Sequence, residues 1–279
     1  MKLATFEDAT GRHTGVVTGD TISPTGIAGS MIDLITQWEH REAEVLRNSR
    51  SARPVPLSGV QLLAPVLRPG KVFAIGLNYA DHIAESQMAT PEHQVWFTKA
   101  VTSINGPYSP ILVGRTGPFV DYEIELVAII GRAGKHIPRE RAHEHVFGYC
   151  VGNDVTERLW QHSTPQWSLG KSFDTHAPIG PWITTADEIA DPHNLELRCF
   201  VNGQQRQASN TKHLVFDVWA QIEHLSQAMT LEPGDVIFTG TPAGIGATMD
   251  PRQFLKPGDV LRSEIDGLGV MEATLVAEP

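Results

Sequence analysis

The sequence predicts an α+β protein, because strand-like and helix-like segments both occur along its 279 residues, and three patterns illustrate this mixture. Short apolar runs, such as the one within residues 121–130, are separated by turns rich in glycine and proline. The dipeptide Asn202-Gly203 lies between two strand-like runs and is typical of a type I′ β-hairpin. The clearest amphipathic helix is indicated by apolar residues at helical spacing between Val215 and Met229.

Composition and charge limit the classes of function. Hydrophobic residues make up 41% and charged residues 19%, and no run approaches the roughly 18 apolar residues that a membrane span needs. The formal net charge is −10 without a basic stripe, so we expect no nucleic acid and no membrane as partner. No signal peptide is visible, and Cys150 and Cys199 lie in apolar runs. We therefore expect a cytoplasmic protein with reduced thiols.

The chain divides into two predicted domains. Residues 1–65 predict a small N-terminal α+β domain and linker, with strands over 1–6 and 13–17 and a helix that follows Ser30. Asp33, three residues after Ser30, completes a capping-box pattern. The predicted large domain, 66–279, follows a proline-rich stretch and opens with an apolar run that predicts a buried strand.

Two acidic residues lie in a segment that otherwise predicts a buried strand. Glu123 and Glu125 alternate with apolar residues over 121–130, so their side chains share one face. Like charges there repel each other and lose hydration, which predicts a cation between them. Asp154 follows a second apolar run, 146–151, and three carboxylates form an all-oxygen donor set suited to Mg²⁺, Mn²⁺ or Ca²⁺. The alternative is a solvated strand edge, with Asp154 as a helix cap.

Other candidate residues lie on predicted helices and loops. If the segment after the first strand of the large domain is helical, His82 and Glu85 share a face, where a carboxylate can orient an imidazole base; a surface pair is the alternative. The polar segment 86–93 is a candidate lid. Lys171 lies among small and apolar residues, and either faces solvent or holds an anion. A short helix is predicted over 155–162.

The glycine-rich segment 239–246 is a further candidate loop. It lacks the glycine patterns of nucleotide-binding loops, which argues against a nucleotide or dinucleotide cofactor. Its backbone N–H groups and the Thr241 hydroxyl could instead bind a carboxylate.

Taken in order, five segments resemble the fumarylacetoacetate hydrolase family, and the resemblance covers essentially all of residues 71–270. They are Asn-Tyr-x-x-His-x-x-Glu at 78–85, Glu-x-Glu at 123–125, Asn-Asp-Val-Thr-Glu-Arg at 153–158, Gly-Lys-Ser-Phe-Asp at 170–174 and Thr-Gly-Thr-Pro-x-Gly-x-Gly at 239–246. The resemblance, more than periodicity, implies a mostly β, mixed-sheet roll for the large domain. It also implies a homodimer, and it implies nothing about the N-terminal part.

The resemblance assigns roles to individual residues. It implies a Mg²⁺ or Mn²⁺ site, a catalytic group in which His82 and Glu85 activate water, and a set of substrate contacts. The implied metal ligands are Glu123, Glu125 and Asp154; the catalytic residues are His82, Glu85 and Lys171; and the substrate-binding residues are Tyr79, Arg158, Gln161 and Thr241.

The activity implied by the resemblance is hydrolysis of a carbon–carbon bond in a 1,3-diketo acid of acylpyruvate or diketo-sugar-acid type, giving pyruvate-like and carboxylate products. The alternative is an oxaloacetate decarboxylase or an enol–keto tautomerase of the 5-carboxymethyl-2-hydroxymuconate isomerase type, because all three reactions pass through the same enolate. A non-catalytic binding scaffold is a third hypothesis. It is disfavoured because a scaffold has no need of a base beside its metal ligands.

Overall fold

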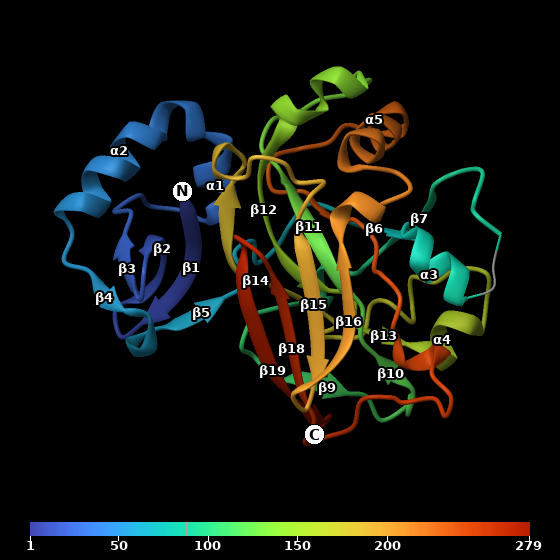
Figure 1. Cartoon of the computed structure of the whole chain (residues 1–279). Coiled ribbons are helices and arrows are strands. Elements are labelled where there is room, and N and C mark those ends of the chain that lie inside the picture. The colour runs from blue at the N-terminus through green and yellow to red at the C-terminus, as the bar shows by residue number, and fades with distance from the viewer. Residues whose placement is uncertain (87–88) are drawn as a thin grey trace.

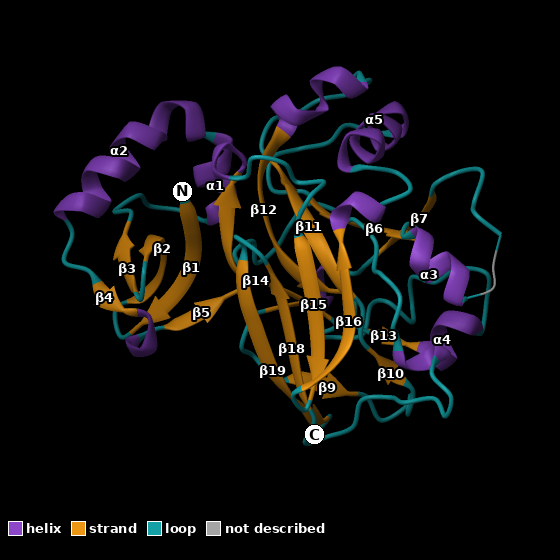
Figure 2. Ribbon diagram, viewed as in Figure 1, coloured by secondary structure: helices purple, strands orange, loops and turns teal. Residues whose placement is uncertain are grey.

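The computed structural model describes residues 1–86 and 89–279, and within them strands predominate (Figure 2). The predicted α+β class is therefore confirmed. The helices of the described residues are α1 (Met31–Thr36), α2 (Trp38–Ser51), α3 (Ala80–Glu85), α4 (Arg158–His162) and α5 (Val218–Ala228). None of them is long and apolar enough to cross a membrane.

A mixed sheet runs through most of the molecule (Figure 1). Its main path is β4 (Val55–Pro56), β3 (Thr21–Pro24), β2 (Gly11–Thr18), β1 (Lys2–Asp8), β14 (Ala177–Thr185), β12 (Val146–Asn153), β11 (Ile124–Ile130), β17 (Val236–Phe238), β6 (Val72–Gly76) and β7 (Val95–Thr98). β5 (Gln61–Leu63) pairs with β1, and β8 (Ile104–Asn105) with β14. Parallel pairing occurs between β17 and β6 and between β14 and β8, so the sheet is mixed as expected.

A second sheet packs over the first. In spatial order it contains β16 (Gln204–Asn210), β15 (Glu196–Val201), β18 (Val260–Ile265), β19 (Gly269–Ala277) and β9 (Ile111–Val113). The predicted hairpin joins β15 to β16, and Asn202 and Gly203 have φ values of 52° and 76°, as a type I′ turn requires.

A short two-stranded ladder occupies the start of one segment that we predicted to be helical. β10 (Val120–Asp121) pairs with β13 (Thr156–Glu157), which keeps residues 156–157 extended. The Glu157 carboxylate then accepts a hydrogen bond from the Trp160 N–H and caps α4. The prediction of a helix over 155–162 is therefore wrong at its start, because α4 begins at Arg158.

Strand β11 is buried on both faces, which fixes the direction of its acidic side chains. Leu126 faces the core between the two sheets and α5. Val127 faces the other core, which the N-terminal helices cover. Because side chains alternate along a strand, Glu123 and Glu125 lie on the Val127 side, where the strand leaves the core.

The N-terminal part is joined to the rest by the sheet itself. β1 pairs antiparallel with β14, with Leu3 opposite Ile183, so the mixed sheet continues from one part into the other. The predicted capping box between Ser30 and Asp33 is present at the start of α1. A domain boundary near residue 65 stays a prediction; it falls between the end of β5 and the start of β6.

Candidate active site

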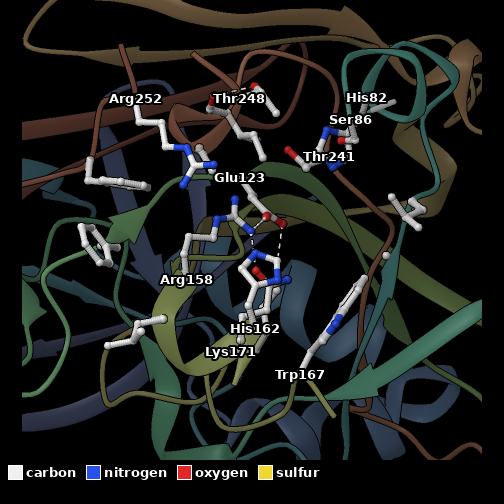
Figure 3. A pocket seen from close by; sticks show the side chains of 18 of the residues that line it. His82, Ser86, Glu123, Arg158, His162, Trp167, Lys171, Thr241, Thr248 and Arg252 are labelled. Atoms are coloured by element: carbon white, nitrogen blue, oxygen red, sulfur yellow. Dashed lines mark hydrogen bonds and ion pairs between the residues drawn. The ribbon is translucent and has the colours of Figure 1, made fainter. Parts of the chain in front are cut away.

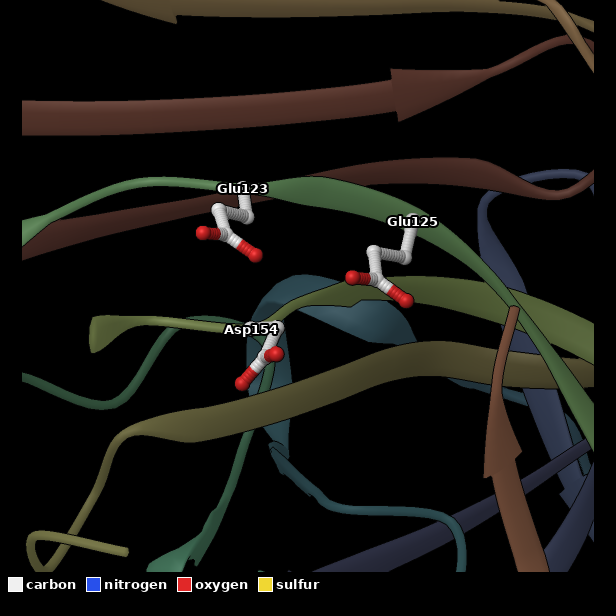
Figure 4. Close-up of side chains that lie close together, drawn as sticks. All are labelled: Glu123, Glu125 and Asp154. Carbon is white, nitrogen blue, oxygen red and sulfur yellow. The ribbon is translucent and has the colours of Figure 1, made fainter. Parts of the chain in front are cut away.

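The three predicted metal ligands lie together at the N-terminal end of β11 (Figure 4). Antiparallel pairing places Ile124 opposite Asn153, and the Asp154 N–H donates to the Glu123 carbonyl at 2.8 Å. Carboxylate oxygens of Glu123, Glu125 and Asp154 lie within 4.8 Å of one another, and all three residues are buried. The pairing register of β11 and β12 therefore brings carboxylates from two segments that are distant in sequence into one buried cluster.

Cationic side chains neutralise two of these carboxylates. Lys171 Nζ lies 2.8 Å from Glu123 Oε2 and 2.6 Å from Asp154 Oδ2. Arg158 Nη1 lies 2.7 Å from Glu123 Oε1, and Lys99 Nζ lies 2.5 Å from Asp154 Oδ1. Burial by itself would raise the pKa of Glu123, but the charges of Lys171 and Arg158 outweigh it and lower the pKa to about 2.

Glu125 is the carboxylate without such a partner. Its Oε2 accepts a hydrogen bond from the Gly240 N–H at 2.6 Å, and none of the described cationic side chains forms an ion pair with it. Burial, followed by the charges of Asp154 and Glu123, raises the pKa of Glu125 well above its ordinary value. A divalent cation bound to the three oxygens would supply the missing positive charge, so these residues fit a hard metal ion.

The predicted His82–Glu85 pair forms on α3. His82 Nδ1 lies 2.8 Å from Glu85 Oε1, while Glu85 Oε2 accepts from the Gly244 N–H at 2.9 Å and from the Thr248 hydroxyl at 3.0 Å. Burial would raise the pKa of Glu85, but these hydrogen bonds and that of His82 outweigh it and lower the pKa. Because an ionised carboxylate can only accept, Nδ1 donates to it, and a neutral His82 keeps its lone pair on Nε2.

A pocket of about 870 Å³ connects the base to the carboxylate cluster (Figure 3). Of the predicted site residues, its wall includes His82, Glu123, Arg158, Gln161, Lys171 and Thr241. Its wall also includes residues that we did not predict, among them Phe119, His162, Arg252 and Phe254. The structure therefore brings a candidate base, a candidate metal ligand and several hydrogen-bonding groups to one cavity.

Two of the predicted substrate-binding residues are held by other side chains. Arg158 Nε and Nη2 donate to Asp121 Oδ2 at 2.9 and 2.8 Å, and Nη1 donates to Gln161 Oε1 at 2.9 Å. The Thr241 hydroxyl donates to the Ile124 carbonyl and accepts from Gln207 Nε2. Substrate contacts by Arg158 and Thr241 stay predictions, and the structure shows how these two side chains are fixed at the pocket wall.

Tyr79 lies apart from the pocket wall. Its side chain is fully buried, and among the described residues its hydroxyl has no hydrogen-bond partner. Burial, followed by the charges of Glu125 and Asp81, raises the pKa of Tyr79 well above its ordinary value. A direct contact between Tyr79 and substrate stays a prediction.

The sequence did not reveal several residues that organise the site. Lys99 is one of them: its ammonium group is fully buried and donates to Asp154, the Val155 carbonyl and the Lys171 carbonyl. Asp121 and Gln207 hold Arg158 and Thr241 from other strands, and no local pattern points to either contact. The candidate lid, 86–93, includes residues 87–88, which lie outside the described residues.

A buried carboxylate cluster beside an imidazole–carboxylate pair on a mixed sheet is typical of metal-dependent enzymes, and comparisons with known proteins give the family. The family model for the C-terminal domain of fumarylacetoacetate (FAA) hydrolase matches residues 71–276. The chain belongs to the fumarylacetoacetate hydrolase family, which confirms the resemblance inferred from the five segments.

Curated relatives carry a more specific name. The chain is 43% identical over 264 residues to a mitochondrial oxaloacetate tautomerase of Bos taurus, covering 94% of this chain and 84% of that protein. It is 47% identical over 221 residues to a mitochondrial oxaloacetate tautomerase of Xenopus laevis, covering 78% of this chain and 69% of that protein.

Solved structures share the fold over the whole chain. A fumarylacetoacetate hydrolase from Exiguobacterium antarcticum has 38% identity and a TM-score of 0.90. A maleylpyruvate hydrolase from Sphingobium sp. SYK-6, in complex with manganese(II) and pyruvate, has 33% identity and a TM-score of 0.86. A 5-carboxymethyl-2-hydroxymuconate delta-isomerase from Mycobacterium smegmatis has 36% identity and a TM-score of 0.81. Each alignment covers 100% of both chains.

The comparisons overturn one expectation. We expected a cytoplasmic protein, but curated relatives from Bos taurus, Homo sapiens and Xenopus laevis are mitochondrial. The expectation rested partly on Cys150 and Cys199, which are both buried and free of disulfide bonds. Free thiols argue against an oxidising compartment, but they do not distinguish one reducing compartment from another.

Proposed function

We propose that this protein is a divalent-metal-dependent tautomerase that converts the enol form of oxaloacetate into the keto form. The observation that carries the proposal is the pocket itself, which has the His82 imidazole on one wall and Glu123 of the carboxylate cluster on another. The name shared by the curated relatives supports oxaloacetate as substrate. The sequence raised an enol–keto tautomerase as an alternative but not oxaloacetate as its substrate, and we now prefer this reaction to carbon–carbon hydrolysis.

The reaction needs little beyond the groups in the pocket. The enol loses its hydroxyl proton, carbon 3 gains a proton, and no bond between heavy atoms forms or breaks. His82 Nε2 is the atom that exchanges a proton with the substrate, because Nδ1 is held by Glu85. Glu85 is itself fixed by Gly244 and Thr248, so the imidazole keeps one orientation toward the pocket.

We propose Mg²⁺ or Mn²⁺ as the cofactor, held by Glu123, Glu125 and Asp154. When bound, such an ion would act as a Lewis acid and withdraw electrons from the enol system of a 2-oxo acid. Lys171 would hold Glu123 and Asp154 in place through its ion pairs with both carboxylates. The manganese and pyruvate of the Sphingobium structure support this cofactor. We also propose a homodimer, which the family resemblance supports.

A direct assay tests the proposal. Freshly dissolved enol oxaloacetate absorbs in the ultraviolet, and we expect the purified protein with Mg²⁺ or Mn²⁺ to accelerate the decay of that absorbance. In D₂O, the enzyme should deliver deuterium to one face of carbon 3 and release no CO₂. An unchanged rate of ketonisation would refute the proposal, and stoichiometric pyruvate and CO₂ would identify a decarboxylase instead.

Hydrolysis is the second candidate, and the same His82–Glu85 pair favours it. An imidazole oriented by a carboxylate can take a proton from water as readily as from an enol, and the similar Sphingobium structure is a maleylpyruvate hydrolase. Products made from acylpyruvates in ¹⁸O-water decide the question. Label in the carboxylate of the released acid would establish hydrolysis, whereas intact acylpyruvates would exclude it for those substrates.

A further inference from the structure

Arg252 is a cationic residue of the pocket wall that the proposed chemistry does not use. It lies in the connection between β17 and β18, and Figure 3 shows its side chain extending into the pocket on the side of Arg158. Its charge reaches across the cavity, since Arg252 together with Arg158 lowers the pKa of His162, although burial is the largest cause. The guanidinium therefore faces the space in which a substrate would lie.

The positive charge of Arg252 has no match in the described residues. Arg158 and Lys171, the other strong cations of the pocket wall, are engaged by Asp121, Glu123 and Asp154 at 2.6–2.9 Å. Glu123 is the carboxylate of the wall, and these two cations already pair with it. The described structure gives Arg252 no ion pair or hydrogen bond. An anionic group bound in the pocket could accept hydrogen bonds from the Arg252 guanidinium and pair with its charge.

The backbone beside Arg252 is anchored to the site. The Gln253 N–H donates to the Gly246 carbonyl at 3.0 Å, and a Cβ atom at Gly246 would lie 1.8 Å from the Gln253 carbonyl oxygen. Gly246 therefore permits this close approach. Phe254 also packs against Phe119, with 5.0 Å between ring centroids. Arg252 thus extends from a fixed loop, although its own side chain is exposed.

We propose that Arg252 binds the distal carboxylate of a 2-oxo dicarboxylate whose keto-acid head lies at the carboxylate cluster. Arg252 is then a specificity-determining residue that selects dicarboxylates over neutral-tailed 2-oxo acids. This inference rests on the proposed function. A pocket of about 870 Å³ is larger than a four-carbon acid fills, so the same residue serves longer 2-oxo dicarboxylates as well.

Paired substrates test the selectivity. 2-Oxosuccinamate is oxaloacetate with its distal carboxylate replaced by a neutral carboxamide. We expect Arg252→Met to lower kcat/KM for oxaloacetate about tenfold or more, as for a lost charged hydrogen bond, and for 2-oxosuccinamate less than about threefold. Arg252→Lys should recover part of the loss. Arg47→Met, which removes an exposed arginine of α2 outside the pocket, is the matched control and should change neither value.

Binding without turnover separates this inference from the proposed reaction. With Mg²⁺ present, calorimetry compares N-oxalylglycine and N-oxalyl-4-aminobutyrate with their primary amides, which differ from them only in the distal charge. We expect the wild type to bind at least one acid more tightly than its amide, and Arg252→Met to remove that preference while oxamate binds equally to both proteins. This result would support the inference even if oxaloacetate is not tautomerised. A preference that survives in Arg252→Met, or a wild type without one, overturns it.

Discussion

Replacing Glu125 with glutamine should have opposite effects on the metal-free and the metal-loaded protein. The carboxylate oxygens of the cluster lie within 4.8 Å of one another, and two unit charges at that distance repel by about 3.5 kcal/mol at an effective dielectric constant of about 20. Lys171, Lys99 and Arg158 offset part of this repulsion through Glu123 and Asp154. The raised pKa of Glu125 favours its protonated, neutral form, and this form reduces the repulsion further.

We therefore expect metal-free Glu125→Gln to be more stable than the wild type by about 1–2 kcal/mol, because the neutral glutamine needs neither an unmatched buried charge nor the uptake of a proton on folding. The glutamine Oε1 can still accept from the Gly240 N–H, so this bond need not be lost. With a ligand missing, millimolar Mg²⁺ or Mn²⁺ should no longer raise the stability of the variant. Urea unfolding with EDTA and with each metal measures both effects.

Glu157→Gln is the control for this experiment. Glu157 is a fully buried carboxylate outside the cluster, and it accepts from the Phe119 and Trp160 N–H groups at 3.0 and 2.8 Å. Its replacement should lower stability, because two charge-assisted bonds weaken, while the stabilisation by metal remains. The reasoning is refuted if metal-free Glu125→Gln is less stable than the wild type, or if metal stabilises this variant as strongly as the wild type.

Three further predictions concern the metal, the base and a helix cap. Chelation with EDTA should abolish enol–keto conversion and Mg²⁺ or Mn²⁺ should restore it; full activity after exhaustive chelation would exclude the metal site. His82→Ala should lose about 10²–10⁴-fold in rate, the usual share of general acid–base catalysis, yet keep the metal-dependent rise in melting temperature. Asp217→Ala should lower stability by about 1 kcal/mol at pH 7, because the Asp217 carboxylate caps α5 through the Ala220 N–H. Burial would raise the pKa of Asp217, but this bond and Arg139 outweigh it and lower the pKa, so the destabilisation should fade as the pH drops below the ordinary value of 3.8; a difference that persists in acid would contradict this assignment.

The part of the site that the sequence predicted is the part set by strand geometry. Alternation along β11 puts Glu123 and Glu125 on one face, and this follows from period-2 spacing alone. Asp154 joins them because β12 runs antiparallel beside β11, a pairing that periodicity cannot specify. The family resemblance implied only that Asp154 shares a metal site with the two glutamates. The His82–Glu85 contact was likewise foreseen, because residues three apart on a helix are neighbours.

The residues that the sequence did not reveal are those that connect segments far apart in the chain. Lys99 reaches Asp154 over 55 positions of the chain, and Gln207 reaches Thr241 from a strand of the second sheet. Such contacts depend on how the fold brings distant segments together, within one sheet for Lys99 and between two sheets for Gln207, and this leaves no spacing signal along the chain. Arg252 was missed for a related reason, since an exposed arginine in a loop looks solvated until the surrounding fold places it at a pocket.

The arrangement of charges also bears on which of the three enolate reactions occurs. Tautomerisation, decarboxylation and acylpyruvate hydrolysis share an enolate and differ in whether carbon 3 exchanges a proton, a carboxylate or an acyl group. In the proposed mode of binding, the carboxylate cluster contacts the 2-oxo acid head that all three substrates have in common, and Lys99 and Lys171 hold that cluster in place. Discrimination among the three reactions then falls to groups that contact the tail, and Arg252 of the pocket wall is the cation that we propose for this role. A positive charge there holds a distal carboxylate in its ionised form and opposes its loss as neutral CO₂, which favours proton exchange at carbon 3 over decarboxylation.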